Sequence, residues 1–141
     1  MPKYYVDTCI FLNIWEQEIG PDPKKPFWKG STEFIKKAMI EKSLHLSSVV
    51  LKELRHTTDD YSQEKSYLLE EAKILAVLKE DAPFARWIEK KFPLSEEDAL
   101  HYVLAKRHQL ILITRDKKLL SFANKHGVIA YQPEEVNSEL K

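Results

Sequence analysis

The stretch that most constrains the fold runs from residue 94 to residue 116. Ser95 is a favourable N-cap, and apolar residues at helical spacing predict a helix over residues 95–107 with one buried side. The apolar run 110–113 is rich in β-branched residues, which is typical of a strand covered on both faces in a parallel sheet. Ligands bind beyond the carboxyl ends of such strands, and Asp116 stands at that position.

Each acidic residue near a predicted strand end also has a local explanation. Ser95 and Asp98 have the three-residue spacing of a capping box, and Asp116 can be the N-cap of the helix that follows it. Asp7 likewise stands between a β-prone segment, residues 3–6, and an apolar helical pattern. Taken singly, Asp7 and Asp116 need no role beyond capping.

The rest of the chain alternates between strand and helix patterns. Right-handed crossovers between four short strands predict a three-layer α/β/α sandwich with a short parallel sheet, in one domain over residues 1–141. The polar segment 134–141 is expected to fray. The other strands are expected at 3–6, 44–50 and 128–131, and the helices at 10–18, from Ser31 or Thr32 to 42, after Ser47 and Ser48, at 64–79, at 84–91, and from 117 to a left-handed C-cap at Gly127.

The helical patterns between residues 64 and 91 carry more apolar side chains than one face of a sheet needs. Trp87 and Ile88 are predicted to point inwards. Tyr67, Leu68 and Trp87 are expected in the core, and a surface for a partner is the alternative.

Composition excludes several classes of site. The single cysteine, Cys9, excludes an intramolecular disulfide and a Cys-rich zinc site and fits a cytoplasmic protein. Three glycines do not suffice for the glycine-rich loops that bind dinucleotides or ATP. No apolar run reaches the ~20 residues of a membrane span, so no membrane association is expected. The zero formal charge means that contact with nucleic acid must use local basic patches.

Four carboxylates occupy equivalent places in this pattern. Asp7 follows the first strand, Glu53 lies in the helix after the second, Asp98 begins a helix, and Asp116 follows the strand at 110–113. Several carboxylates at one sheet edge repel one another unless a divalent cation neutralises them. Oxygen ligands suit Mg²⁺ or Mn²⁺, which promote hydrolysis of phosphate esters.

Four motifs give the chain a resemblance to the PIN domain family, which includes the VapC-type toxin ribonucleases. They are YYVDTCIFLN, SSVVLKEL, LSEEDALHYVLA and LILITRDKKLL, and together they span nearly the whole chain. The resemblance implies that Asp7, Glu53, Asp98 and Asp116 form an acidic quartet that holds one or two Mg²⁺ or Mn²⁺ ions. Thr114 and Thr8 would support it. Cys9 departs from the short polar residue that many such toxins carry after the Asp-Thr pair.

The resemblance also implies an activity and partners. The expected activity is hydrolysis of single-stranded or looped RNA by a toxin that forms a homodimer and is inhibited by a small antitoxin. Among the basic residues near the acids, Arg115 and Lys117 are the candidates for RNA binding. His101 shares a helix face with Asp98, where an ordinary buried histidine is favoured over a metal ligand.

Two other functions compete with the nuclease. A catalytically silent PIN-like module would keep its acids as helix caps and bind a protein or RNA. An aspartyl-phosphate enzyme would use Asp7 as nucleophile. The haloacid-dehalogenase type needs a second aspartate two residues later, where this chain has Cys9.

Overall fold

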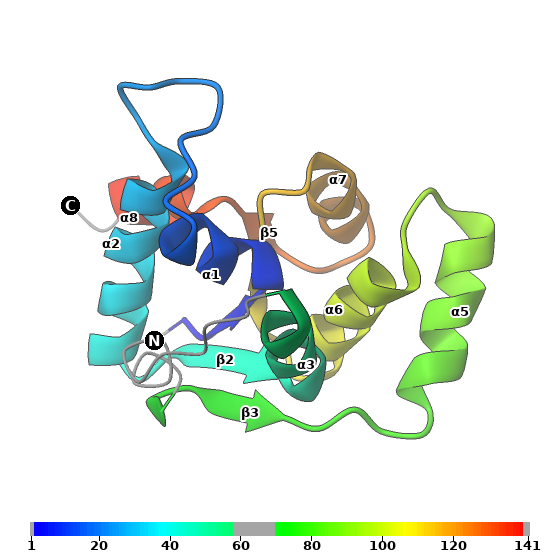
Figure 1. Ribbon diagram of the computed structural model, residues 1–141. Helices are drawn as coiled ribbons and strands as arrows, with labels where there is room; N and C mark the ends of the chain where they lie inside the picture. The colour runs from blue at the N-terminus through cyan, green and yellow to red at the C-terminus, as the bar shows by residue number, and fades with distance from the viewer. Residues whose placement is uncertain (1, 58–69, 140–141) are drawn as a thin grey trace.

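A five-stranded parallel sheet forms the centre of the protein, in a computed structural model that describes residues 2–57 and 70–139 (Figure 1). The strand order is β3-β2-β1-β4-β5, and all four neighbouring pairs are parallel. The central strands β1 and β2 are buried along their whole length, as expected for a sheet covered on both faces. The strands are β1 (Tyr4–Val6), β2 (Leu44–Ser47), β3 (Lys73–Leu75), β4 (Ile111–Ile113) and β5 (Ala130–Tyr131).

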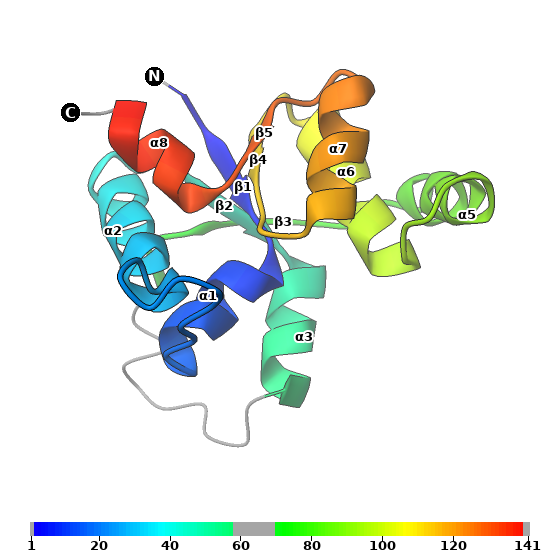
Figure 2. The same cartoon turned by 90° about the horizontal axis from the view of Figure 1, so that it is seen from above.

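Helices cover both faces of this sheet and complete the predicted three-layer sandwich. In Figure 2, α1, α2 and α8 lie on one side of the sheet, and α5, α6 and α7 lie on the other. None of the helices in the described residues is both long and apolar enough to cross a bilayer. The helices are α1 (Thr8–Trp15), α2 (Phe27–Ile40), α3 (Ser48–Thr57), α5 (Asp81–Lys91), α6 (Glu96–Arg107), α7 (Lys117–Lys125) and α8 (Pro133–Glu139).

The fold around residues 94–116 agrees with the sequence pattern. Ser95 is the N-cap of α6, and its hydroxyl accepts a hydrogen bond from the backbone N–H of Asp98 at 3.1 Å. The apolar run becomes β4, which pairs with β1 and β5. Gly127 follows α7 with φ +85°, the left-handed conformation predicted for it.

The predicted helix over residues 64–79 is wrong from residue 71 onward, whereas Glu70 is helical as predicted. Residues 73–75 form the edge strand β3, which pairs with Leu46 and its neighbours in β2. The apolar spacing there fits a helix, but pairing with a buried strand overrides so weak a local preference. Tyr67 and Leu68 lie outside the described residues.

Two further helical predictions are corrected. Helix α2 begins at Phe27 after Pro26, so Ser31 and Thr32 lie inside it and do not cap it. Trp87 is 52% exposed, whereas its neighbour Ile88 is buried as predicted. Successive helical residues point about 100° apart, so an inward Ile88 carries Trp87 towards the surface.

The C-terminal segment does not fray over residues 133–139, because it forms α8. Pro133 at the first helical position and Glu134 and Glu135 in the first turn are favourable N-terminal residues. Val136 is buried, and α8 packs on α2. Gly30 of α2 leaves room for Glu134, because a Cβ atom at Gly30 would overlap the Glu134 carboxylate.

Candidate active site

The predicted acids lie on elements that meet at one edge of the sheet. Asp7 directly follows β1, and Asp116 follows β4 as the N-cap of α7. Glu53 lies in α3, which continues directly from β2, and Asp98 lies in the first turn of α6. Because β1, β2 and β4 are parallel, their carboxyl ends point to the same edge. We call Asp7, Glu53, Asp98 and Asp116 the acidic edge.

Thr114 connects two members of the acidic edge. Its buried hydroxyl donates to Asp7 Oδ2 at 2.6 Å and accepts from the backbone N–H of Asp116 at 3.1 Å. Asp7 is itself buried, and its Oδ1 accepts from the backbone N–H of Cys9 at 3.3 Å. Both oxygens of Asp7 are thereby fixed in position.

A buried histidine of α6 contacts two residues of the acidic edge. His101 Nε2 lies 3.6 Å from Asp7 Oδ1 and 3.5 Å from Glu53 Oε1. Its Nδ1 lies 2.7 Å from the Tyr5 hydroxyl, which also contacts Ser47 Oγ at 2.8 Å. Sequence reasoning favoured an ordinary buried histidine at 101 and missed Tyr5 and Ser47. The helix face that His101 shares with Asp98 was the available signal for its place.

The pKa of His101 is set by two opposed effects. Burial lowers it, but the carboxylates of Asp7, Glu53 and Asp98 outweigh burial, and the pKa is raised above its ordinary value. Nε2 faces two acids, so it carries a proton in either charge state of the ring. A protonated His101 supplies one positive charge beneath the acidic edge.

Asp98 reports the crowding of negative charge most directly. Burial, followed by the charges of Asp7 and Asp116, raises its pKa from 3.8 to about 6. His101 and Ser95 oppose this rise. Asp98 is therefore close enough to sense acids from two other elements.

The local capping roles are present as well. Asp7 accepts from Cys9 in the first turn of α1, and Asp116 Oδ1 accepts from the backbone N–H of Leu119 at 3.0 Å in α7. Capping accounts for one oxygen of each residue. It does not account for the contacts from Thr114 and His101, which reach across the fold.

The acidic edge offers oxygen donors but no complete cage for a cation. Within the described residues, no three His, Cys, Asp or Glu side chains converge closely enough to form a ready-made metal site. The Thr8 hydroxyl, next to Asp7, is buried and has no hydrogen-bond partner in that part of the chain. Carboxylates with such an unsatisfied hydroxyl beside them fit Mg²⁺ or Mn²⁺, because Mg²⁺ usually keeps several of its waters.

Cys9 is a partly buried thiol beside the acids. Burial raises its pKa, and the negative charge of Asp7 adds to the effect. Its Sγ lies 3.8 Å from Thr114 Oγ1, so the thiol contacts the hydroxyl that holds Asp7. The thiol stays protonated near neutral pH, which makes a nucleophilic role unfavourable.

Arg115 is predicted to bind RNA, and its guanidinium is engaged in contacts within the chain. Its side chain is only 7% exposed. Its guanidinium donates to Asn13 Oδ1 at 2.6 Å, to both carboxylate oxygens of Glu134 at 2.6 and 2.9 Å, and to Ser31 Oγ at 3.0 Å. It also stacks on the Phe27 ring at 4.1 Å. Arg115 therefore joins α1, α2 and α8, whereas Lys117 is exposed at the start of α7.

Comparisons with known proteins identify the fold. A family model described as PIN domain matches residues 4–125. FitAcB from Neisseria gonorrhoeae is 17% identical with a TM-score of 0.64, and a toxin–antitoxin complex from Klebsiella pneumoniae is 19% identical with a TM-score of 0.64; each alignment covers 93% of this chain and 98% of the other. VapBC2 from Rickettsia felis, bound to a DNA fragment from its promoter, is 16% identical with a TM-score of 0.66, covering 92% and 97%. No curated protein matches the sequence.

Proposed function

The chain belongs to the PIN domain family, and we propose that it is a metal-dependent endoribonuclease that hydrolyses RNA phosphodiester bonds at the acidic edge. One observation supports this most strongly. Four carboxylates lie on elements that meet at one edge of the sheet, a buried histidine contacts two of them, and burial together with the charges of Asp7 and Asp116 raises the pKa of Asp98 to about 6. A fold has no structural need for such a concentration of like charge.

Asp7, Glu53, Asp98 and Asp116 are the proposed ligands of Mg²⁺ or Mn²⁺. A bound ion of this kind supplies charge that activates water and stabilises the attacking and leaving oxygens of phosphoryl displacement. Thr114 holds Asp7 in place, and His101 fixes the relative positions of Asp7 and Glu53. Without a bound cation, the raised pKa of Asp98, about 6, shows that negative charge is poorly compensated at this position.

The solved structures guide the biological proposal. One is described as a toxin–antitoxin complex and another as VapBC2 with promoter DNA. We propose that this chain is a cytoplasmic toxin that cleaves RNA, forms a homodimer, and is inhibited by a small antitoxin that covers the acidic edge.

A catalytically silent interaction module is the alternative. The capping bonds of Asp7 and Asp116 favour it, as does the lack of a ready-made metal cage in the described residues. In that case the acids would be caps, and the surface would bind a protein or RNA without cleaving it.

Cleavage of a mixed RNA pool distinguishes the two functions. Purified protein is incubated with the pool in EDTA, Mg²⁺ or Mn²⁺, beside Asp98→Asn and the matched control Glu97→Gln, and products are resolved on a denaturing gel. Glu97 lies next to Asp98 in α6 but is exposed. Cleavage that needs metal, survives in Glu97→Gln and disappears in Asp98→Asn supports the nuclease. Folded, partner-free wild type that cuts nothing supports the silent module.

Calorimetric titration with Mn²⁺ tests the ligands without relying on activity. Wild type and Glu97→Gln should bind Mn²⁺ alike, and Asp98→Asn should bind it at least tenfold more weakly, because one anionic ligand is lost. Equal binding by all three proteins would remove Asp98 from the proposed ligand set.

A further inference from the structure

A groove lies beside the acidic edge, between α7 and the link that joins α5 to α6. Its volume is about 410 Å³, within the range of roughly 300–1,000 Å³ found for small-ligand sites. The link contributes Phe92, Pro93 and Leu94, and α7 contributes Lys117, Lys118, Ser121 and Phe122; Lys125 and His126 complete the wall. Asp116 immediately precedes the α7 wall, and Ser95, the cap of the helix that bears Asp98, immediately follows the link. The groove therefore adjoins two of the four acid-bearing positions.

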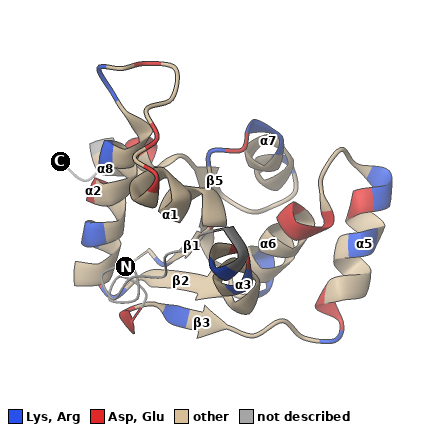
Figure 3. Ribbon diagram, viewed as in Figure 1, with Lys and Arg blue, Asp and Glu red and all other residues tan. Residues whose placement is uncertain are grey.

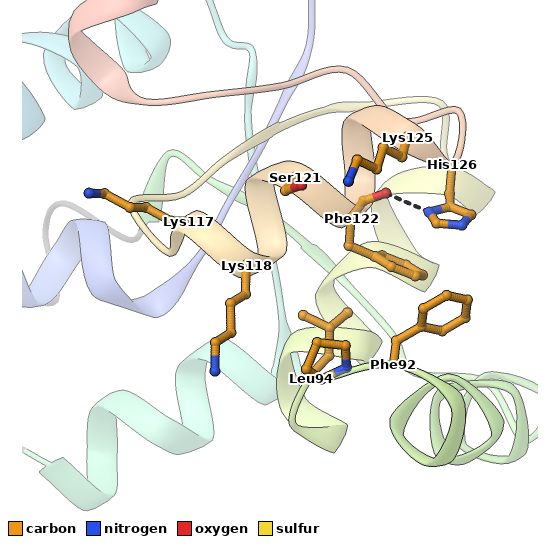
Figure 4. Close-up of a pocket in the computed structure, with 9 residues that line it drawn as sticks. Phe92, Leu94, Lys117, Lys118, Ser121, Phe122, Lys125 and His126 are labelled. Atoms are coloured by element: carbon orange, nitrogen blue, oxygen red, sulfur yellow. Dashed lines mark hydrogen bonds between the residues drawn. The ribbon is translucent and has the colours of Figure 1, made fainter.

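The floor of this groove, which we call the α7 groove, is aromatic. Phe122 stacks on His126 with ring centroids 4.2 Å apart, and Phe92 meets Phe122 edge-on at 4.8 Å. Figure 4 shows the rings of Phe92 and Phe122 facing each other across the gap between α7 and the link. His126 Nδ1 donates to the Phe122 carbonyl at 2.8 Å, which fixes the orientation of the imidazole. Phe122 is buried under these contacts, so the partly exposed rings of Phe92 and His126 supply the aromatic surface, which suits a flat, π-faced group.

The rim of the α7 groove is cationic. Lys117, Lys118 and Lys125 are exposed, and within the described residues none of them forms an ion pair. Lys118 extends towards the link beside Leu94, whereas Lys117 points away from the aromatic floor (Figure 4). Lys118 and Lys125 are seven residues apart, which places them about 10 Å apart along the helix axis. Figure 3 shows this basic helix beside the acidic first turn of α6.

We propose that the α7 groove is a nucleotide subsite for single-stranded RNA, which seats one base on the aromatic floor and its flanking phosphates on the lysine rim. The inference rests on the proposed nuclease function, because it names how the substrate of that site is held. Phosphates need cations, and the acidic edge repels them unless it is neutralised. The exposed lysines nearest to Asp116 in the sequence supply that attraction, and the adjoining rings supply stacking that tolerates any base.

Binding is measured by fluorescence anisotropy with a short fluorescein-labelled single-stranded RNA of mixed sequence. The Asp98→Asn background with Mg²⁺ present keeps the probe uncut. Ser121→Trp fills the groove from the exposed face of α7, and Ser121→Ala is its matched control. A double Lys118→Ala, Lys125→Ala variant, called the rim variant, removes two of the three rim lysines and leaves Lys117, which points away from the floor. A double Lys29→Ala, Lys36→Ala variant removes two exposed lysines of α2 on the opposite face of the sheet.

We expect Ser121→Trp to weaken RNA binding about fivefold or more, because it displaces a stacked base. The rim variant should weaken binding and reduce the slope of log affinity against log salt by about 1.4, since each phosphate contact with a single strand contributes about 0.7. Ser121→Ala and the α2 variant should bind as the background protein does. Inorganic polyphosphate carries charge but no bases, so its affinity should fall in the rim variant and stay unchanged in Ser121→Trp.

Unchanged RNA affinity in folded Ser121→Trp and in the rim variant would overturn the proposal. If such proteins still bound a synthetic peptide rich in Glu and Phe, and Ser121→Trp blocked that binding, the groove would instead be a site for an acidic peptide. Circular dichroism establishes whether each variant is folded. If Ser121→Trp does not fold, the RNA affinity of the rim variant alone tests the proposal. Because binding is measured without cleavage, loss of the groove leaves the nuclease proposal standing, and absence of cleavage by wild type leaves the binding result standing.

Discussion

The protein holds buried carboxylates in two contrasting ways. Asp81, at the start of α5, accepts from Arg107 Nη2 at 2.9 Å and from the backbone N–H of Leu78 at 2.7 Å. At the acidic edge, by contrast, no lysine or arginine of the described residues forms an ion pair with Asp7, Asp98 or Asp116. The first carboxylate is neutralised by the chain itself. The second group leaves negative charge for a ligand or a proton to neutralise.

This comparison separates structural from functional acids by their partners. A buried carboxylate normally requires a cation and hydrogen bonds to offset its desolvation. Asp81 meets that requirement, and its ion pair with Arg107 connects α5 to α6. Asp98, which is half-buried, meets it only in part through His101 and Ser95, and its pKa stays raised at about 6. Replacing the aspartate by asparagine in each region should therefore have opposite consequences: loss of activity at the acidic edge, and loss of stability at Asp81.

The largest expected effect is that of Asp7→Asn on cleavage. Asparagine keeps the size and capping oxygen of Asp7 but removes the charge that Thr114 and His101 hold in place. We expect the rate of RNA cleavage to fall at least about a thousandfold, or about 4 kcal/mol of transition-state stabilisation. Asp81→Asn is the control from the other region, and its single-turnover cleavage rate should match that of wild type at a temperature where both are folded. Equal rates for Asp7→Asn and wild type would contradict the assignment.

The next effect concerns stability and Arg115, which joins three helices. Arg115→Ala leaves Asn13 and Ser31 buried without this donor and releases Glu134 of α8. We expect the free energy of unfolding to fall by about 3 kcal/mol, because the buried Asn13 and Ser31 lose a charged donor, whereas Glu134, at 41% exposure, can be solvated by water. Urea denaturation measures the change.

Arg115→Lys is the matched control for that measurement. Lysine keeps the charge but cannot reproduce the planar fork that serves Asn13 and Glu134 together, so we expect it to recover less than half of the loss. Wild-type stability in Arg115→Ala would show that α8 is held by its apolar contacts alone.

The different fates of Arg115 and Thr114 show what the sequence could predict. The resemblance to the PIN domain family placed Thr114 beside the acids, and its hydroxyl does donate to Asp7. Arg115 was assigned to RNA because it adjoins an acid in sequence. Its partners include Ser31 and Asn13, which lie 84 and 102 residues away, and Glu134 in the C-terminal helix. Local pattern locates a strand end, but it does not reveal which long-range partners compete for a cation.

The same limit explains the errors in secondary structure. The central strands β1, β2 and β4 are short and mostly apolar, and their pattern sufficed to predict a parallel sheet. The edge strand β3 is half exposed, carries Lys73, and exists because β2 offers it an unpaired edge. Helix α8 is polar except for Val136, so its sequence resembles a loose tail until Arg115 and Gly30 are placed beside it. Tyr5 was likewise predicted only as a strand residue, because its hydroxyl meets His101 through the fold.

A smaller effect is expected for Asp81→Asn on stability. The variant keeps an oxygen that can accept from Leu78 but removes the charge opposite Arg107, whose side chain is 30% exposed. Water can solvate part of the released guanidinium, so we expect a loss of about 1–2 kcal/mol in the free energy of unfolding. Thermal and urea denaturation measure it. A gain in stability would show that Asp81 resembles the acidic edge after all.

The smallest effect has the opposite sign and sharpens the comparison most. In the metal-free protein, Asp98→Asn should raise the free energy of unfolding by about 1 kcal/mol at pH 7.5, a value discounted because the carboxyl is only half-buried. The folded pKa of Asp98 is about 6 and its ordinary value is 3.8, so the folded state binds the proton more tightly than the unfolded chain. Wild type therefore gains stability from this group as pH falls from above 6 towards 4, and the advantage of Asp98→Asn should disappear over the same interval. Urea titrations at pH 7.5 and pH 4 measure this difference, with Glu97→Gln as the matched control.

Addition of Mg²⁺ at pH 7.5 should reverse the order of stability of wild type and Asp98→Asn, because the ion binds the wild-type carboxylates more tightly than those of the variant. A destabilised Asp98→Asn at pH 7.5 without metal would mean that Asp98 is a structural carboxylate like Asp81.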